Sequence, residues 1–391
     1  MHEEAALQLY LVLGQQAQRY LALCRHFGDA ASALAAGPYA WDVAWPGSRS
    51  RDGSWPGLAA ATALYRAWPD GELAAAPRQL WHRALRWLEA ANRGLWQATP
   101  GMTWPLALAA LPDPPPLLFW EGSETALGLP QVALVGSRAA TRYGLDIARN
   151  WAGELVQAGL AITSGLASGI DGAAHRGALA RAGVTVAVMG CGLDRCYPPA
   201  NQALMREIPA AGGLCVSEFV PGTPPEARHF PRRNVVISAL SLAVTVIEAG
   251  PDSGSLITAA ASDQFSRPVM VVPGSIHSLQ SRGCHEWLKR GQAVLAETPQ
   301  DVMRELLPGL RTLYGLAAPL PLPAEGSPAP RPSLPAGGQA LLDVMAWDVW
   351  DLDRLAATSA LAAPCLLALL GELEVAGWIA AVPGGYQQLS A

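Results

Sequence analysis

Two hydrophobic patterns alternate along the middle of the chain. From residue 131 onward, short apolar runs recur between glycine, proline and polar residues. They are VALV 132–135, LAIT 160–163, VTVAVMG 184–190, LCVSE 214–218, AVTVIEA 243–249, PVMVVPG 268–274 and a short AVLA 293–296. Amphipathic stretches separate most of these runs; between Arg142 and Ala158, for example, Ile147, Trp151 and Leu155 recur every fourth residue. Apolar strands that alternate with helices predict an α/β domain over residues 111–306, with a parallel sheet covered on both faces.

The segment before this domain shows helical spacing instead. The runs LQLYLVLGQQAQRYLALCRHFG (7–28) and QLWHRALRWLEAANRGLW (79–96) are amphipathic, and they predict a helical domain over residues 1–110. Eight of the fourteen tryptophans lie here, and we expect them to pack its core. Some of them lie in WDVAWPGSRSRDGSWPG (41–57), whose turn-forming residues predict an irregular loop.

Two further segments follow the α/β domain. Residues 307–338 are rich in proline, glycine and alanine, and they predict an extended linker without a core of its own. The pattern of residues 339–391 predicts three helices and then a hairpin around Pro383-Gly384-Gly385, which is the outline of a winged helix.

Composition narrows the class of protein. The chain is 51% hydrophobic and 15% charged, values typical of folded globular domains. No apolar run reaches the roughly 20 residues of a membrane span, and the start MHEEAALQLY carries acids where a signal peptide carries bases. We therefore expect a cytoplasmic location, no membrane partner and reduced thiols for the six cysteines. Cys191 and Cys196 could form half of a zinc site, but no second pair has ligand spacing.

Charge is distributed unevenly along the sequence. The net charge is −5, yet residues 131–300 hold 14 basic and 12 acidic side chains. Residues 339–391 hold one base, Arg354, and six acids. Any phosphate-binding surface is therefore expected in the middle domain, whereas the acidic winged helix is expected to contact protein rather than nucleic acid.

Unusual residues gather where the predicted strands end. Glycine and serine turns follow three of the strands, and arginines and one aromatic lie in loops at the same edge. These candidate residues are Gly136, Ser137, Arg138, Ser164, Gly165, Phe230, Arg232, Arg233, Ser253, Gly254 and Ser255. Ligands of parallel α/β sheets bind outside the carboxyl ends of the strands, and turns that open helices favour anions. Phosphates approached by backbone, hydroxyl and guanidinium groups would suit this edge, and a base could stack on Phe230.

Plain structural interpretations remain open for each feature. Gly-Ser turns often only cap helices, and Phe230 could anchor a loop. Asp171 and His175 could suggest hydrolysis with Ser164 or Ser168; alternatively, Asp171 caps its helix and His175 bonds within the sheet edge. The sequence has no Walker lysine, G-x-S-x-G, H-E-x-x-H or C-x-x-C motif, and no acid follows the second strand to hold a dinucleotide ribose. We therefore expect neither catalysis nor a cofactor.

The motifs, taken in order, resemble those of the DNA processing protein A family (DprA, also called Smf). The matching runs are VALVGSRAATRYG, ITSGLASGIDGAAHRGAL, AVMGCGLDRCYPPAN, SEFVPGTPPEARHFPRRN, EAGPDSGSLITAA and VVPGSIHSLQSRGCHEWLKRGQA. The resemblance covers about residues 104–303. It implies an extended Rossmann-like domain, and the chain's ends fit the family's plan of a SAM-like helical domain and a winged helix.

The same resemblance implies a function. Such proteins bind single-stranded DNA without sequence preference, form homodimers, protect incoming strands during natural transformation and help load the recombinase RecA. Gly136-Ser137-Arg138 match the family's phosphate-binding turn, and Ser253-Gly254-Ser255 match its S-G-S turn. Phe230, Arg233 and Asn234 match its F-P-x-R-N segment, whose aromatic is implied to stack on a base. Duplex DNA stays open as a second ligand.

The chain departs from the family pattern at three positions. Ser168 and Val235 stand where arginines are usual, and His285 stands where asparagine is usual. Two basic groups are thus missing from the expected site, and Arg232 is a candidate to compensate for one. The N-terminal run LGQQAQRYLALCRHFG also lacks the G-x-G hairpin of helix-hairpin-helix DNA contacts. The alternative function is a phosphoribohydrolase-like enzyme on a related fold, although its catalytic glutamate is absent from EAGPDSGSLITAA.

Overall fold

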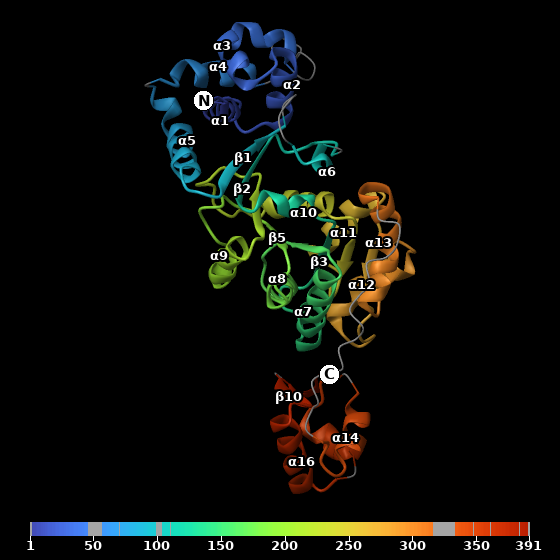
Figure 1. Cartoon of the computed structure of the whole chain (residues 1–391). Helices are drawn as coiled ribbons and strands as arrows, with labels where there is room; N and C mark the ends of the chain where they lie inside the picture. Colours follow the sequence, from blue (N-terminus) through green and yellow to red (C-terminus); the bar gives the residue numbers. More distant parts are fainter. Residues whose placement is uncertain are drawn as a thin grey trace.

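The structure is a computed structural model. It describes residues 2–45, 57–69, 71–98, 104–109, 111–315, 333–346, 348–359, 361–382 and 384–389. Its centre is a nine-stranded sheet (Figure 1). The strand order across this sheet is β1 (Arg93–Gln97), β2 (Leu117–Gly122), β6 (Leu214–Ser217), β5 (Thr185–Val188), β4 (Ala161–Ser164), β3 (Gln131–Val135), β7 (Val244–Val246), β8 (Val269–Val271) and β9 (Val294–Leu295).

The predicted parallel sheet is confirmed. The seven apolar runs form β3 to β9, and all of these strands pair in parallel. Alternate residues of β3 belong to different cores: Val132 and Leu134 to one, Ala133 and Val135 to the other. Because both sides of each strand are buried, these strands read as continuous apolar runs rather than as alternating ones.

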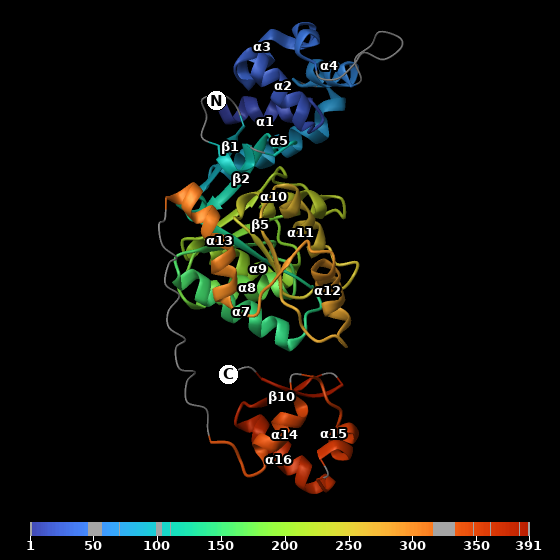
Figure 2. The ribbon, with the colours of Figure 1, turned by 90° about the vertical axis from the view of Figure 1, so that its right-hand side faces the viewer.

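Helices cover both faces of the sheet, as predicted (Figures 1 and 2). One face packs against α10 (His229–Leu240), α11 (Ser255–Gln264) and α12 (Arg282–Lys289). The other face packs against α7 (Arg142–Gln157), α8 (Ile170–Ala180) and α13 (Pro299–Tyr314). The extended Rossmann-like fold expected from the sequence is therefore present.

The strand order fixes where a ligand can bind. The chain runs outward from β3 through β4, β5 and β6, and then returns to place β7 on the other side of β3. The connections on either side of β3 thus leave the sheet in opposite directions, which opens a crevice outside the carboxyl ends of β3 and β7. Turns that follow these two strands carry most of the candidate residues.

The helical prediction for residues 79–96 is wrong at its end. Helix α5 (Ala75–Leu88) stops before Arg93, and β1 pairs antiparallel with β2, which itself pairs antiparallel with β6. The sheet therefore begins before residue 111. Trp96 stacks on Trp120 of β2, with ring centroids 5.5 Å apart, and a Cβ at Gly94 would overlap the same ring. Pairing with a tryptophan-bearing strand overrides the helical spacing.

The N-terminal helices share a core with the sheet. They are α1 (His2–Val12), α2 (Ala17–Phe27), α3 (Ala30–Trp41), α4 (Leu58–Ala67) and α5. Trp41, Trp45 and Trp87 are buried in this core, as expected, and it continues onto Phe119 of β2 and Met189 after β5. Most of the predicted loop 41–57 lies outside the described residues. The N-terminal helices thus share one core with β1, β2 and the end of β5.

The C-terminal segment has the expected winged-helix pattern. It comprises α14 (Gly338–Met345), α15 (Leu352–Ser359), α16 (Ala363–Val375) and the antiparallel hairpin of β10 (Ile379–Val382) and β11 (Gly385–Gln388). A separate core of leucines, Met345 and Ile379 holds it together. Helix α13 continues to Tyr314, past the expected start of the linker at 307, and residues 316–332 of that linker lie outside the described residues.

No single described helix is long and apolar enough to cross a membrane. One pair bent by 110°, α15 with α16, passes that test together by length and composition. Leu355 of α15 and Leu366, Leu370 and Leu373 of α16 are buried in the winged-helix core, as helices of a packed domain require.

Candidate functional site

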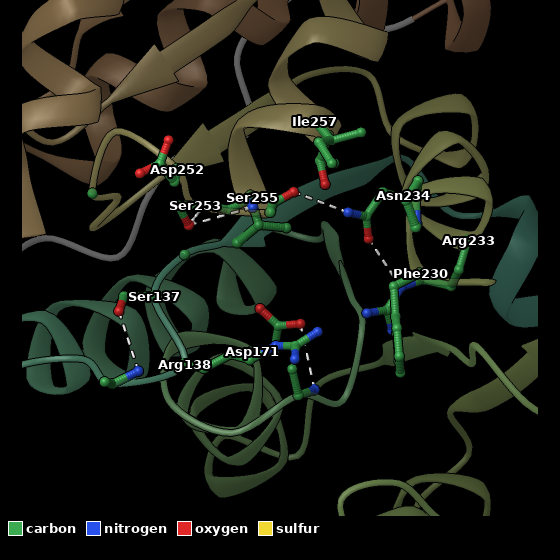
Figure 3. Close-up of a pocket in the computed structure, with 18 of the residues that line it drawn as sticks. Ser137, Arg138, Asp171, Phe230, Arg233, Asn234, Asp252, Ser253, Ser255 and Ile257 are labelled. Atoms are coloured by element: carbon green, nitrogen blue, oxygen red, sulfur yellow. Dashed lines mark hydrogen bonds between the residues drawn. The ribbon is translucent and has the colours of Figure 1, made fainter. Parts of the chain in front are cut away.

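A pocket of about 970 Å³ opens at the carboxyl ends of β3 and β7 (Figure 3). We call it the edge pocket. Nine of the twelve candidate residues line it, namely Gly136, Ser137, Arg138, Phe230, Arg233, Asn234, Ser253, Gly254 and Ser255. They come from the turn after β3, the first two turns of α10 and the turn that opens α11. The strand ends therefore bring together groups separated by more than a hundred residues of sequence.

The turn after β3 presents one unpaired cation to this pocket. A Cβ at Gly136 would lie 2.6 Å from Ile170 and 2.9 Å from the Glu248 carbonyl, so only glycine fits beneath the turn. The Ser137 hydroxyl accepts a hydrogen bond from the Ala139 amide (3.2 Å). Arg138 is exposed, and its guanidinium makes no hydrogen bond or ion pair with any described residue. It is the group best placed to meet a phosphate.

Two aromatic rings line the wall beside Arg138. Phe230 lies in the first turn of α10 rather than in the loop expected from the sequence, and its ring is partly exposed. The Arg138 guanidinium carbon lies 5.1 Å from the centroid of that ring. The Tyr197 ring is 5.6 Å from the Phe230 ring, and Tyr197 is 42% exposed. Together they offer a surface on which a nucleobase can stack.

Arg233 is the buried counterpart of Arg138. It is only 5% exposed, and its Nη1 donates to the carbonyls of Gly165, at the end of β4, and Val188 of β5 (2.8 Å to Val188). Its Nε donates to the Asn234 amide oxygen (3.0 Å). Burial lowers the pKa of Arg233, and the nearby Asp171 carboxylate opposes that shift. Arg233 therefore stabilises the backbone that forms the edge pocket.

The turn before α11 supplies hydroxyl and amide groups. The Ser253 and Ser255 hydroxyls are 2.7 Å apart, and Asn234 Nδ2 donates to the Gly254 carbonyl (3.0 Å; Figure 3). This turn forms the N-terminus of a ten-residue helix, where the helix dipole favours an anion. The exposed Asp252 carboxylate also lines the pocket and contributes negative charge beside the turn.

Three candidates lie outside the edge pocket. Ser164 is fully buried and donates to the Leu134 carbonyl (2.7 Å). Gly165 lines a small adjoining cavity of about 70 Å³, where a Cβ would overlap the Arg233 guanidinium. Arg232 forms an ion pair with the buried Glu218. Neighbouring residues of a helix point in different directions, so Arg232 does not replace a missing cation of the pocket.

The Asp171–His175 pair serves the structure. Asp171 lies in the first turn of α8 and accepts from the amides of Gly165 (3.1 Å) and Ala167 (3.4 Å). His175 is fully buried, and its Nδ1 is 2.7 Å from the Thr185 hydroxyl. Burial lowers the pKa of His175 to about 3, so the ring is neutral. A fully buried imidazole with so low a pKa is a weak base that a ligand in the pocket does not reach, so it is poorly placed to act as a general base.

Two further residues contribute here that the sequence did not predict: Tyr197 lines the pocket, and Glu248 supports the turn beside it. Tyr197 is not among the candidate residues from the sequence. Its position in a loop after a strand, directly before two prolines, is the sequence signal that could have indicated it. Glu248, after β7, is buried and accepts from the Thr141 hydroxyl and amide (2.9 Å to the amide). Burial raises the pKa of Glu248. This carboxyl fixes the start of α7 beside the β3 turn.

The departures from the family pattern have different consequences. Ser168 is exposed and lines the small cavity between Arg138, Tyr197 and Phe230, so an arginine there would add a cation at the mouth of the site. Val235 packs against the apolar core, and His285 lines another pocket near Lys289. Of these three departures, only Ser168 therefore removes positive charge from the small cavity that adjoins the edge pocket.

The fold and site define an α/β protein with a pocket at the carboxyl ends of its strands, N-terminal helices that share a core with the sheet, and a winged helix. The profile of the DNA recombination-mediator protein A family matches residues 99–307, and that of the DprA winged helix domain matches residues 325–385. This chain belongs to the DNA processing protein A (DprA/Smf) family.

Individual relatives agree with this assignment. The chain is 40% identical to Protein Smf of Escherichia coli K12 over 80% of this chain and 82% of that protein. The X-ray structure of DNA processing protein A from Streptococcus pneumoniae superimposes with a TM-score of 0.60 at 32% identity, covering 77% of this chain and 97% of that one. A Helicobacter pylori DNA processing protein A, whose single-stranded DNA binding mode has been described, gives a TM-score of 0.50 at 32% identity, covering 56% and 96%.

Replacing Arg233 with methionine tests its structural role. We expect the free energy of unfolding to fall by about 1–3 kcal/mol for each buried carbonyl, at Gly165 and Val188, that the change leaves without its donor. Urea titration followed by circular dichroism measures the loss. The control Arg138→Met should change stability by less than about 0.5 kcal/mol, since Arg138 is exposed and unpaired. Equal stability of the two variants would contradict the division of roles.

Proposed function

We propose that this protein binds single-stranded DNA without sequence preference in the edge pocket, and that it acts in natural transformation and recombination. The observation that carries the proposal is the convergence of an unpaired guanidinium, Arg138, with two adjacent aromatic rings and a helix N-terminus. Phosphate neutralisation and base stacking are the two interactions that single-strand binders combine, and neither reads sequence. The single-strand binding described for the Helicobacter pylori relative supports the assignment.

A single strand suits this site better than a duplex. Bases in a duplex are stacked on both faces, whereas Phe230 and Tyr197 require an unstacked base. Membership of the family supports the finer role: the protein protects incoming strands in the cytoplasm and delivers them to the recombinase RecA as a homodimer. The outer edge of β9 is unpaired among the described residues, and Val294 and Leu295 are 44% and 42% exposed there, which is compatible with a second copy at this edge.

We infer a binding protein rather than an enzyme. The carboxylates of the edge pocket are Asp171, which is held by backbone amides, and Asp252, which is exposed. Neither lies in a described constellation with a nucleophile or base. Release of free base from nucleoside monophosphates, without oligonucleotide binding, would instead establish the phosphoribohydrolase alternative.

Arg138→Ala tests the phosphate contact. We expect weaker binding of all single-stranded sequences alike, and a salt slope lower by about 0.7, the increment for one single-strand phosphate. Fluorescence anisotropy of labelled oligonucleotides at several salt concentrations measures both. Arg138→Lys keeps the charge and should keep the slope. A slope for Arg138→Ala equal to that of the wild type would remove Arg138 from the site.

Phe230→Leu tests base stacking. The leucine keeps an apolar side chain but removes the ring, so we expect a loss of about 1–3 kcal/mol in binding, or roughly 5- to 150-fold in affinity. The same oligonucleotide titration measures the loss. Phe265→Leu, a partly buried site against the sheet core, is the matched control. Wild-type affinity with reduced stability would show that Phe230 only anchors α10.

Deleting residues 339–391 tests whether the winged helix contacts DNA. Its one base, Arg354, stacks on Trp350 at 3.9 Å, and α16 exposes Leu367 and Val375 beside acidic residues. A polyanion would be repelled, so affinity should stay within about twofold or rise slightly at low salt. The titration is done at constant protein concentration. A tenfold loss would show that the domain binds DNA.

A further inference from the structure

The structure has a second cavity near the edge pocket. None of the candidate residues predicted from the sequence lines it. It measures about 320 Å³ and we call it the side groove. Its walls come from α5, β1, β2, α9 (Gln202–Ala210) and the segment that follows β5 (Figure 1). The residues used below are Trp87, Arg93, Glu121, Asp194, Arg195 and Arg206.

The carboxylates of the side groove are already neutralised. Glu121 pairs with Arg93 (3.0 Å), and Asp194 pairs with Arg83 of α5 (2.6 Å). Arg195 and Arg206 are exposed, and neither makes a hydrogen bond or ion pair with a described residue. Two guanidinium groups therefore face the groove without a counter-ion, and arginine is the side chain best suited to bind phosphate.

Buried donors in the same wall also lack acceptors. The Trp87 indole Nε1 and the Arg93 Nε have no hydrogen-bond partner in the described part of the chain. Trp87 is only 6% exposed, so its donor is shielded from solvent. Because these donors are buried in the wall, the suitability of the groove for an anionic oxygen rests on Arg195 and Arg206 and on the pairing of the carboxylates.

One segment of chain connects the side groove with the cavity beside Phe230. Arg195 and Cys196 line the groove, while the next two residues, Tyr197 and Pro198, line the cavity beside Phe230. Consecutive Cα atoms are only about 3.8 Å apart, so a single stretch of chain separates the two sites. Tyr197 is exposed at this boundary, where its ring can support a base between them.

We propose that the side groove binds phosphates of the same DNA strand after it leaves the edge pocket and passes over Tyr197, with Arg195 and Arg206 as the phosphate-binding residues. The inference rests on the proposed function, because the strand must first occupy the edge pocket. The DNA strand would then cross the molecule from the carboxyl ends of β3 and β7 toward the N-terminal helices.

The test uses the full chain, the double variant Arg195→Ala/Arg206→Ala and two oligothymidylates. One has about 4 nucleotides and the other about 16, the limits of common single-strand site sizes. We expect the double variant to bind the short strand like the wild type. For the long strand its salt slope should fall by about 0.7–1.4, corresponding to one or two lost phosphate contacts. Anisotropy titrations across a salt series give both values.

Two variants serve as controls. Arg195→Lys/Arg206→Lys keeps both charges and should retain most of the slope. Arg25→Ala/Arg311→Ala removes two charges from exposed positions of α2 and α13 and should change neither strand's binding. Because all these side chains are exposed, thermal melting should be unchanged throughout.

The outcomes separate this inference from the proposed function. If Arg138→Ala weakens both strands while Arg195→Ala/Arg206→Ala matches the charge control at both lengths, the side groove is no DNA site and the edge pocket stands. If the wild type binds neither strand, both proposals fail. If inorganic phosphate stabilises the wild type but not the double variant while the strand slopes stay equal, the groove serves a free anion and the inference is overturned.

Discussion

The buried guanidinium of Arg233 is the interaction on which the carboxyl edge of the sheet depends. It donates to the backbone at Gly165, after β4, and at Val188, in β5, and it bonds to Asn234, which in turn holds the Gly254 carbonyl. One side chain and its neighbour thus tie three strand ends to the first turns of α10. Asp171 provides the balancing charge and fixes the Gly165 turn through its amide. A charge buried this deeply is tolerated only when such partners are complete.

This arrangement explains why three arginines near one site do three different things. Arg233 is buried and bonded to carbonyls, Arg232 is paired with Glu218, and Arg138 is exposed over the Phe230 ring, with no hydrogen bond or ion pair to a described residue. Their shared chemistry is a planar group with five donors, and the environment decides its use. When carbonyls or carboxylates of the protein accept from a guanidinium, few of its donors remain for a ligand. Of these three arginines, Arg138 is therefore the one available to a phosphate. The edge pocket can therefore be rigid and still keep a free cation at its mouth.

The sequence predicted the sheet well because its strands are buried on both faces and so read as unbroken apolar runs. It also predicted that the turns after β3 and β7 meet, since strand ends and switch points follow general rules. It failed where tertiary contacts override local pattern: Arg93–Gln97 became a strand because Trp120 packs over Gly94. It could not assign roles to Arg232 and Arg233, because the direction of a helical side chain depends on where the helix begins. Tyr197 was not predicted as a site residue, because an aromatic residue in a loop belongs to no hydrophobic periodicity that would distinguish it.

The acidic net charge is compatible with the proposed phosphate contacts because pairing, rather than composition, sets the local potential. Glu121, Asp194 and Glu218 each neutralise an arginine that stabilises the fold. Among the arginines without an ion pair to a described residue, Arg138 lines the edge pocket, and Arg195 and Arg206 line the side groove. Screening confines each charge to about 8 Å at physiological salt, so the acids of the winged helix weaken these cavities only when they lie close. A strand would thus respond to a short row of unpaired cations, whereas the total charge of −5 governs only its approach from a distance.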